Sequence, residues 1–326
     1  MVSSADLRTV SCGGISLTDS SNGNAEPPPA AVDPDARTEG PLMTDTPAPQ
    51  DQRGAVHGWT RVSEHAYTRV LAGWNANVGV VIGNQQALLV DSGAGPDQAA
   101  QILGWVRELT ELPLIAVNSH AHFDHVFGNA YLADPQAGGV EAIWAHEAAA
   151  AWIREHGESQ RAAVTELDPQ FAAGEGPHAA ILTPTHTLGS APKDLDLGGV
   201  TATLFHLGRG HTDGDLLVGV DDVVFAGDLV EQGADPAFEG SWPRDWVAAL
   251  RKLSALRDLY PVVVPGHGEV VGMDFVDSMR TTMEQAVRVA TSAVQQSASD
   301  ATKAVPILPY GPEQARALIR RLRSTR

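Results

Sequence analysis

His120-Ala121-His122-Phe123-Asp124-His125 places four potential metal ligands within six residues. In an extended segment the side chains alternate, so positions 120, 122 and 124 share one side and His125 points elsewhere. Four such groups can therefore divide between two neighbouring metal ions, and imidazole together with carboxylate suits zinc or iron. A solvated, histidine-rich turn is the alternative, but three histidines and one aspartate at these offsets should arise by chance on the order of once in a thousand segments. The segment therefore predicts a metal site.

Composition narrows the classes of function. The chain has 326 residues and a hydrophobic fraction of 43%, which is enough to bury a core in one large or two modest domains. No apolar run approaches the roughly twenty residues of a membrane helix, so we expect no membrane span. The net charge of −18 opposes contact with phosphate backbones, and we expect no nucleic-acid partner. Cys12 is the single cysteine, and residues 1–17 lack the pattern of a signal peptide, so a cytoplasmic location is expected.

The histidine run begins where a predicted strand ends. Short apolar strands are expected at 78–82, 87–90 and 114–118, with a helix over 97–109 between the last two. This order is typical of α/β sheets, which usually place their chemistry at the carboxyl ends of strands. Asp91 ends the second of these strands.

Three later segments carry further ligand types. His211 lies in the glycine-flanked loop 208–215. The alternating runs 216–220 and 223–227 read as an antiparallel hairpin, so Asp228 returns to the sheet end from which the chain left after His211. A further strand, 262–264, leads into Gly266-His267-Gly268. All these groups can therefore meet at one rim.

Together these motifs resemble those of the metallo-β-lactamase superfamily, in the right order over about residues 59–272. The resemblance implies an α/β (α+β) fold, an αβ/βα four-layer sandwich with two mixed β-sheets. It implies two Zn²⁺ per chain, with iron or manganese as alternatives. By position in the motifs, His120, His122 and His211 resemble the ligands of the first metal, Asp124, His125 and His267 those of the second, Asp228 the carboxylate that bridges both, and Asp91 a supporting aspartate.

The resemblance and the chemistry of the ligands lead to the same expectation. Three neutral imidazoles leave an open position on a tetrahedral ion, as a catalytic zinc needs. Two close cations lower the pKa of a shared water toward neutrality, and the resulting bridging hydroxide attacks a polarised carbonyl. Asp124 orients this nucleophile and passes its proton to the leaving group. The expected reaction is hydrolysis of an ester, thioester, lactone or amide bond in a small-molecule substrate.

Several alternatives remain open from the sequence. Zinc β-lactamases carry cysteine or serine where this chain has Asp228, which resembles glyoxalase II and the hydrolases around it. Asp228 argues against a β-lactam hydrolase, which stays open as one alternative. The glutathione contacts of glyoxalase II cannot be matched here, so a glutathione thioesterase is also only one option. Others are an iron-dependent oxidoreductase or sulfur dioxygenase, a phosphodiesterase, and a non-catalytic metal-binding paralogue. His122 argues against the flavodiiron branch, and the complete ligand set argues against the single-iron and non-catalytic ones.

The chain divides into three parts by composition. Residues 1–55 are rich in Ser, Gly, Pro, Asp and Ala, and we expect a disordered tail. Residues 56–272 are expected to form the catalytic domain. Residues 273–326 are expected to add helices, over 275–294 and 311–323, that pack on this domain. The first of these helices also offers a surface for a homodimer.

Two groups of residues could be core or part of the site. Aromatic residues after Asp228 either line a substrate pocket or belong to the core: Phe238, Trp242 and Trp246. Three further histidines are expected in the core or on the surface rather than as supporting donors: His146, His186 and His206. We expect Asp215 to cap the loop of His211.

Overall fold

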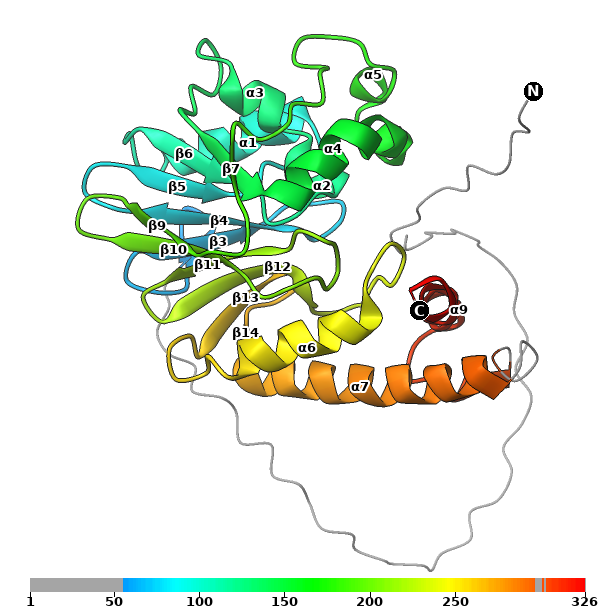
Figure 1. Ribbon diagram of the computed structural model, residues 1–326. Helices are drawn as coiled ribbons and strands as arrows, with labels where there is room; N and C mark the ends of the chain where they lie inside the picture. The colour runs from blue at the N-terminus through cyan, green and yellow to red at the C-terminus, as the bar shows by residue number, and fades with distance from the viewer. Residues whose placement is uncertain (1–54, 297–300, 302, 326) are drawn as a thin grey trace, which may run out of the picture.

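The structure is a computed structural model that describes residues 55–296, 301 and 303–325 (Figure 1). The tail expected over residues 1–55 and Cys12 lie outside these residues, apart from residue 55 itself. Among the described residues, none of the helices combines the length and the apolar character that a membrane span requires.

The first sheet contains eight strands of the described chain, each beside its neighbour in sequence. Strands β1 to β5 pair antiparallel, and β5 to β8 pair parallel. The strands are β1 (Ala55–Val56), β2 (Trp59–Arg61), β3 (Ala66–Val70), β4 (Asn77–Ile82), β5 (Ala87–Val90), β6 (Leu114–Val117), β7 (Ile143–His146) and β8 (His186–Leu188). Because a parallel pair needs a crossover, helices follow each of β5, β6 and β7.

The second sheet contains six strands in the order β14-β13-β12-β11-β10-β9. Only β12 and β13 pair in parallel, and their register shifts twice, beside Gly227 and before Glu231. The strands are β9 (Lys193–Asp196), β10 (Thr201–His206), β11 (Leu216–Val220), β12 (Val223–Glu231), β13 (Val262–His267) and β14 (Val271–Gly272). The predicted hairpin is confirmed as β11 and β12, which pair antiparallel.

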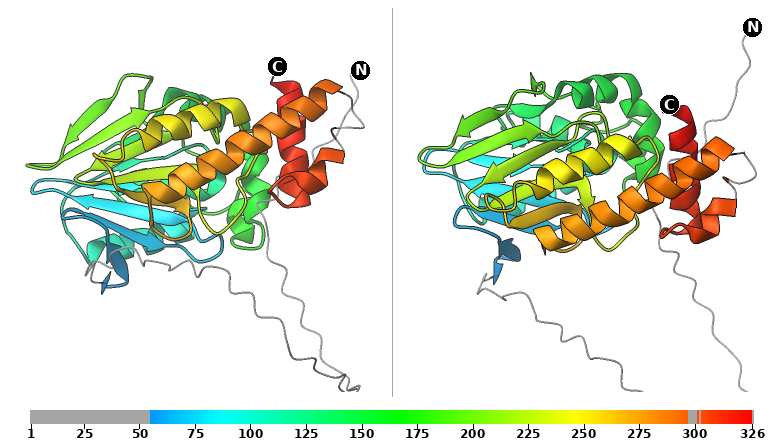
Figure 2. Two further views of the ribbon diagram at one scale, coloured as in Figure 1. Left: turned by 90° about the horizontal axis from the view of Figure 1, so that it is seen from below. Right: turned by 60° about the horizontal axis from the view of Figure 1, so that its bottom comes forward.

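Helices cover the outer faces of both sheets (Figures 1 and 2). In Figure 2, α6 and α7 run side by side across the second sheet, and α9 crosses the far end of α7. The helices are α1 (Pro96–Arg107), α2 (Phe123–Val126), α3 (Asn129–Ala133), α4 (Glu147–Gln160), α5 (Pro169–Ala172), α6 (Pro243–Ser254), α7 (Met273–Gln296) and α9 (Pro312–Ser324), with 3₁₀ turns η1 (Arg161–Val164) and η2 (Val305–Ile307).

The core has a layer between the sheets and one under each set of helices. Val81 and Leu88 of the first sheet meet Leu204 and Val218 of the second in one cluster. A second cluster lies under α1, and a third joins the second sheet to α6, α7 and α9. β5, β11 and β12 are buried along their whole length, which explains their nearly continuous apolar sequences. The predicted four-layer sandwich with two mixed sheets is confirmed.

Candidate metal centre

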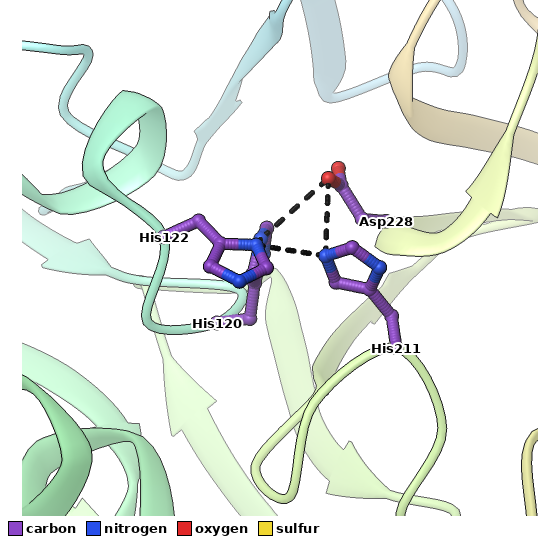
Figure 3. Close-up of side chains that lie close together, drawn as sticks. All are labelled: His120, His122, His211 and Asp228. Atoms are coloured by element: carbon purple, nitrogen blue, oxygen red, sulfur yellow. Dashed lines mark hydrogen bonds and ion pairs between the residues drawn. The ribbon is translucent and has the colours of Figure 1, made fainter. Parts of the chain in front are cut away.

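The structure brings all seven predicted ligands together at one rim of the sandwich, where they form two groups. The atoms offered within a group lie within 4.8 Å of one another. The first group is His120, His122, His211 and Asp228, and the second is Asp124, His125 and His267. Figure 3 shows the first group, whose side chains point toward a common centre from the histidine run, the 208–215 loop and β12.

The histidine run is not the extended segment that we expected. His122 has extended backbone angles, but α2 begins at Phe123, so Asp124 and His125 lie on a helical turn. Successive side chains on a helix are about 100° apart rather than on opposite sides. Asp124 and His125 can therefore both face the second group, which strict alternation would not allow. The prediction of alternation was wrong because the backbone changes from extended to helical within the run, so the side-chain period changes from two residues to about 3.6.

Gln160, at the end of α4, holds the backbone of this run. Its side-chain oxygen accepts from the backbone N–H of Phe123 at 3.2 Å, and its amide donates to the carbonyl of Ala121 at 3.1 Å. Gln160 is buried, so both bonds are shielded from water. Nothing in the sequence near the run signals this residue, because it lies 37 positions away from Phe123.

Asp91 lies behind two of the imidazoles. Its carboxylate accepts from the backbone N–H of Ser119 at 2.7 Å and from the Ser119 hydroxyl at 2.8 Å. Its Oδ2 is also 2.8 Å from Nδ1 of His125, and the Ser119 hydroxyl is 3.1 Å from Nδ1 of His120. Carboxylates in this place fix the tautomer of an imidazole so that Nε2 is free to bind a metal. The position of Asp91 fits the supporting role that we predicted.

Two loop residues hold His211 and His267 in place. The carboxylate of Asp215 accepts from the backbone N–H of Thr212 at 2.9 Å and from its hydroxyl, so it caps the loop of His211. Nδ1 of His267 donates to the carbonyl of Trp74 at 2.8 Å, which turns Nε2 of His267 toward the centre.

Asp228 belongs to the first group but also reaches imidazoles of the second. Its carboxylate oxygens are close to the Nε2 atoms of four imidazoles, at 3.6 Å for His120, 3.4 Å for His125, 3.4 Å for His211 and 3.4 Å for His267. His122 approaches through Nδ1 instead, at 3.0 Å from Nε2 of His120 and 2.8 Å from Nε2 of His211. Asp228 therefore occupies the position that a carboxylate shared by two ions would need.

Carboxylates set the charge of the imidazoles in the metal-free protein. Burial lowers the pKa of His125, but nearby carboxylates, foremost Asp124, outweigh burial and raise this pKa to about 9. Burial also lowers the pKa of His211, but Glu231 and other carboxylates raise it to about 9. For His122, burial and the charge of His211 prevail and lower the pKa to about 3.

The donor set fits divalent cations. Burial raises the pKa of Asp124 and of Asp228, but the neighbouring imidazoles outweigh burial and lower both pKa values. Oδ2 of Asp124 and Oδ1 of Asp228 are buried, and neither accepts a hydrogen bond within the described part of the chain. Unpaired buried carboxylate oxygens are costly unless a charge compensates them, and a cation in each group would do so. Each group also offers the mixture of imidazole and carboxylate that divalent transition metals bind.

Two of the three aromatic residues that were considered for a pocket wall belong to the core. Phe238 and Trp246 are fully buried core residues, so they cannot contact a substrate, whereas Trp242 is half-buried. Instead, the ring of Trp152 lies 6.2 Å from that of His122, and Trp74 packs against the core beneath the run. No spacing relates these two tryptophans to the motifs, so the sequence did not indicate them.

The three histidines expected in the core or on the surface have partners other than the seven candidate ligands. His146 and His206 stack on each other with ring centroids 4.1 Å apart, and His186 packs against Trp144. Glu231 also lies beside a candidate ligand, although the motifs did not indicate it. Its Oε1 is 3.3 Å from Nδ1 of His211. Its signal was a carboxylate in an otherwise apolar strand, three positions after Asp228.

Two mixed sheets packed face to face, with a histidine and aspartate cluster at their rim, define a class of metal-binding sandwich proteins. The chain belongs to the metallo-beta-lactamase superfamily, whose family model matches residues 71–267. It is similar to the metallo-beta-lactamase type 2 of Bacteroides fragilis, with 22% identity over 239 residues that cover 69% of this chain and 85% of the relative.

Two further similarities were found, one to a relative and one to a solved structure. It is 28% identical over 222 residues to the acyl-coenzyme A thioesterase MBLAC2 of Gallus gallus, covering 62% of this chain and 76% of the relative. The solved structure of a metallo-beta-lactamase from Pontibacter korlensis aligns with a TM-score of 0.54 and 20% identity over 69% of this chain and 98% of that one. At that identity the structural likeness concerns the fold alone.

Proposed function

We propose that this protein is a dinuclear metal-dependent hydrolase that cleaves an ester or thioester bond in a small-molecule substrate. The observation that carries the proposal is the position of Asp228, whose oxygens lie 3.4–3.6 Å from imidazoles of both groups. A site for one ion would not need a carboxylate there. The complete set of seven ligands also favours catalysis over a binding role.

The side chains would divide the work as follows. When bound, two cations supply Lewis acidity and lower the pKa of a shared water, which makes a nucleophile available near neutral pH. Asp124 presents its free Oδ2 to the centre, orients the attacking water and carries its proton to the leaving group. Asp91 and the Trp74 carbonyl keep the imidazoles of His125 and His267 in a fixed orientation. Fixed donors accelerate the reaction because they need no rearrangement in the transition state.

The choice of a thioester or ester rests on two arguments. A relative with 28% identity is named as an acyl-coenzyme A thioesterase, and this chain has aspartate at position 228. The second candidate is β-lactam hydrolysis, because another relative is named as a metallo-beta-lactamase. We propose no nucleic-acid partner, because the net charge of −18 opposes binding to phosphate backbones. A homodimer through the C-terminal helices stays a prediction.

A substrate panel tests the proposal. The full chain, loaded with zinc, would be assayed on acyl thioesters, aryl esters, lactones, nitrocefin and bis-nitrophenyl phosphate, with bound metals measured by mass spectrometry. We expect about two metal equivalents and the highest kcat/KM on a thioester or ester. Highest activity on nitrocefin would support the second candidate, and highest activity on the phosphodiester would contradict both. Two bound metals with no activity on any compound would favour a binding role.

A further inference from the structure

Glu231 is a buried carboxylate at the end of β12, with 8% of its surface exposed. Its Oε1 lies 3.3 Å from Nδ1 of His211, on the side of the ring that faces away from the candidate metal centre. The other ring nitrogen, Nε2, lies 2.8 Å from Nδ1 of His122 and 3.4 Å from Oδ2 of Asp228. The imidazole of His211 is therefore placed between Glu231 and the centre.

No other group in the described chain competes for Nδ1 of His211. This nitrogen is buried and forms no other hydrogen bond within the described chain. The Glu231 carboxylate, 3.3 Å away, is the acceptor within its reach. The place of Glu231 is itself fixed, because its backbone lies opposite His267 in the parallel pairing of β12 with β13. Its carboxylate also accepts from the backbone N–H of Ala237 at 3.3 Å.

The other imidazoles that face the centre through Nε2 show what such a partner does. Nδ1 of His125 meets Asp91, Nδ1 of His267 meets a backbone carbonyl, and Nδ1 of His120 meets a serine hydroxyl. Each acceptor holds the proton on Nδ1 and leaves the lone pair of Nε2 for a metal. Glu231 completes this arrangement for the fourth imidazole.

We propose that Glu231 is the positioning residue of His211: its carboxylate holds the imidazole in the tautomer and orientation that bind a cation in the first group. The proposal rests on the proposed function only in that His211 binds a metal. It requires no particular substrate. Glu231 is buried and lies against the ring nitrogen of His211 that faces away from the centre, so it acts through His211.

Zinc binding to the full metal-free chain tests this role. The two dissociation constants would be measured by competition with a chromophoric chelator, and Co²⁺ absorption spectra would report the ligand geometry. We expect Glu231→Ala to weaken one of the two binding steps by about 10- to 100-fold and to change the Co²⁺ spectrum. Glu231→Gln keeps the size and an acceptor oxygen but loses the charge, so it should restore part of the affinity and guard against a folding defect in the alanine variant.

Gln314→Ala is the matched control for a purely structural role. Gln314, on α9, accepts from the backbone N–H of Phe238, so it holds the same loop that Glu231 holds through Ala237. We expect this variant to keep zinc affinity within about twofold of wild type. Asp91→Ala should weaken zinc binding in the second group, because Asp91 contacts His125 directly, and it should also affect the first group through Ser119 and His120.

The outcomes separate the two proposals. Wild-type zinc affinity and an unchanged Co²⁺ spectrum in both Glu231 variants would overturn the role of Glu231 and leave the proposed function intact. Equal losses in Glu231→Ala and Gln314→Ala would also overturn it, because the loop would then be the cause. A wild-type chain that binds no zinc would overturn the proposed function and this inference together. Normal zinc binding without hydrolysis would contradict only the function.

Discussion

Gly266 in β13 has no room for a side chain, and this gives a sharp prediction. A Cβ at this position would overlap Oδ1 of Asp228 and would lie 2.7 Å from the carbonyl carbon of Gly227 and 2.8 Å from the amide nitrogen of Asp228. Two of these contacts are with backbone, which cannot rotate away. We expect Gly266→Ala to lower the free energy of unfolding by about 2–3 kcal/mol through overpacking. Alanine also restricts the unfolded chain more than glycine does, and this effect offsets only about 0.4–1 kcal/mol of the lost stability.

Urea unfolding of the metal-free protein and zinc content after dialysis would measure the effect. Gly272→Ala is the control in the adjacent strand β14, because the nearest atom to its Cβ would be the carbonyl oxygen of Pro261 at an ordinary 3.7 Å. It gains the same stabilisation of about 0.4–1 kcal/mol from the unfolded chain and should be no less stable than wild type. We also expect Gly266→Ala to lose at least one zinc, since Asp228 must move. Wild-type stability and zinc content in Gly266→Ala would show that Asp228 does not lie against this glycine.

Three further predictions concern the same centre. Asp228→Ala should lose at least one metal equivalent and most activity. His178→Ala should keep both, because His178 pairs with Asp134, 2.8 Å away, and is not one of the seven candidate ligands; unchanged metal content in the first variant would contradict the bridging position. Because their raised pKa values of about 9 keep His125 and His211 protonated at pH 7, zinc binding at that pH should release about two or more protons. Calorimetry in buffers of different ionisation enthalpy measures the release, and none would refute it. Gln160→Ala should lower the free energy of unfolding by about 1–3 kcal/mol in urea; no loss would mean that its two bonds are dispensable.

Much of the fold followed from short apolar runs and turns. The strands at 78–82 and 87–90 and the hairpin of β11 and β12 were predicted within a residue or two, because their sequences fit buried pleated strands. Convergence of the ligands also followed, since the motifs of His120, His211 and His267 lie at the end of a strand or in the loop after it. Asp228 was expected just beyond a strand, but it lies within β12, which continues to Glu231. The division into three parts remains a prediction.

The backbone conformation of the histidine run and the packing of the residues around the centre could not be derived from the sequence. The helical turn at Asp124 depends on backbone bonds to Gln160, which is far away in sequence. Trp246 looked like a candidate for a pocket wall, but its indole N–H donates to the carbonyl of Leu229 inside the core. Partners of this kind are set by tertiary packing, which sequence spacing does not encode.

The seven candidate ligands are contributed by both sheets, with His120 near the end of the first and His267 at the end of β13 in the second. During synthesis, the centre is therefore incomplete until nearly the whole sandwich has left the ribosome and closed. We expect ion loading to follow folding. The bound ions would then stabilise the packing of the two sheets, so a strong chelator should speed the irreversible heat inactivation of the loaded protein.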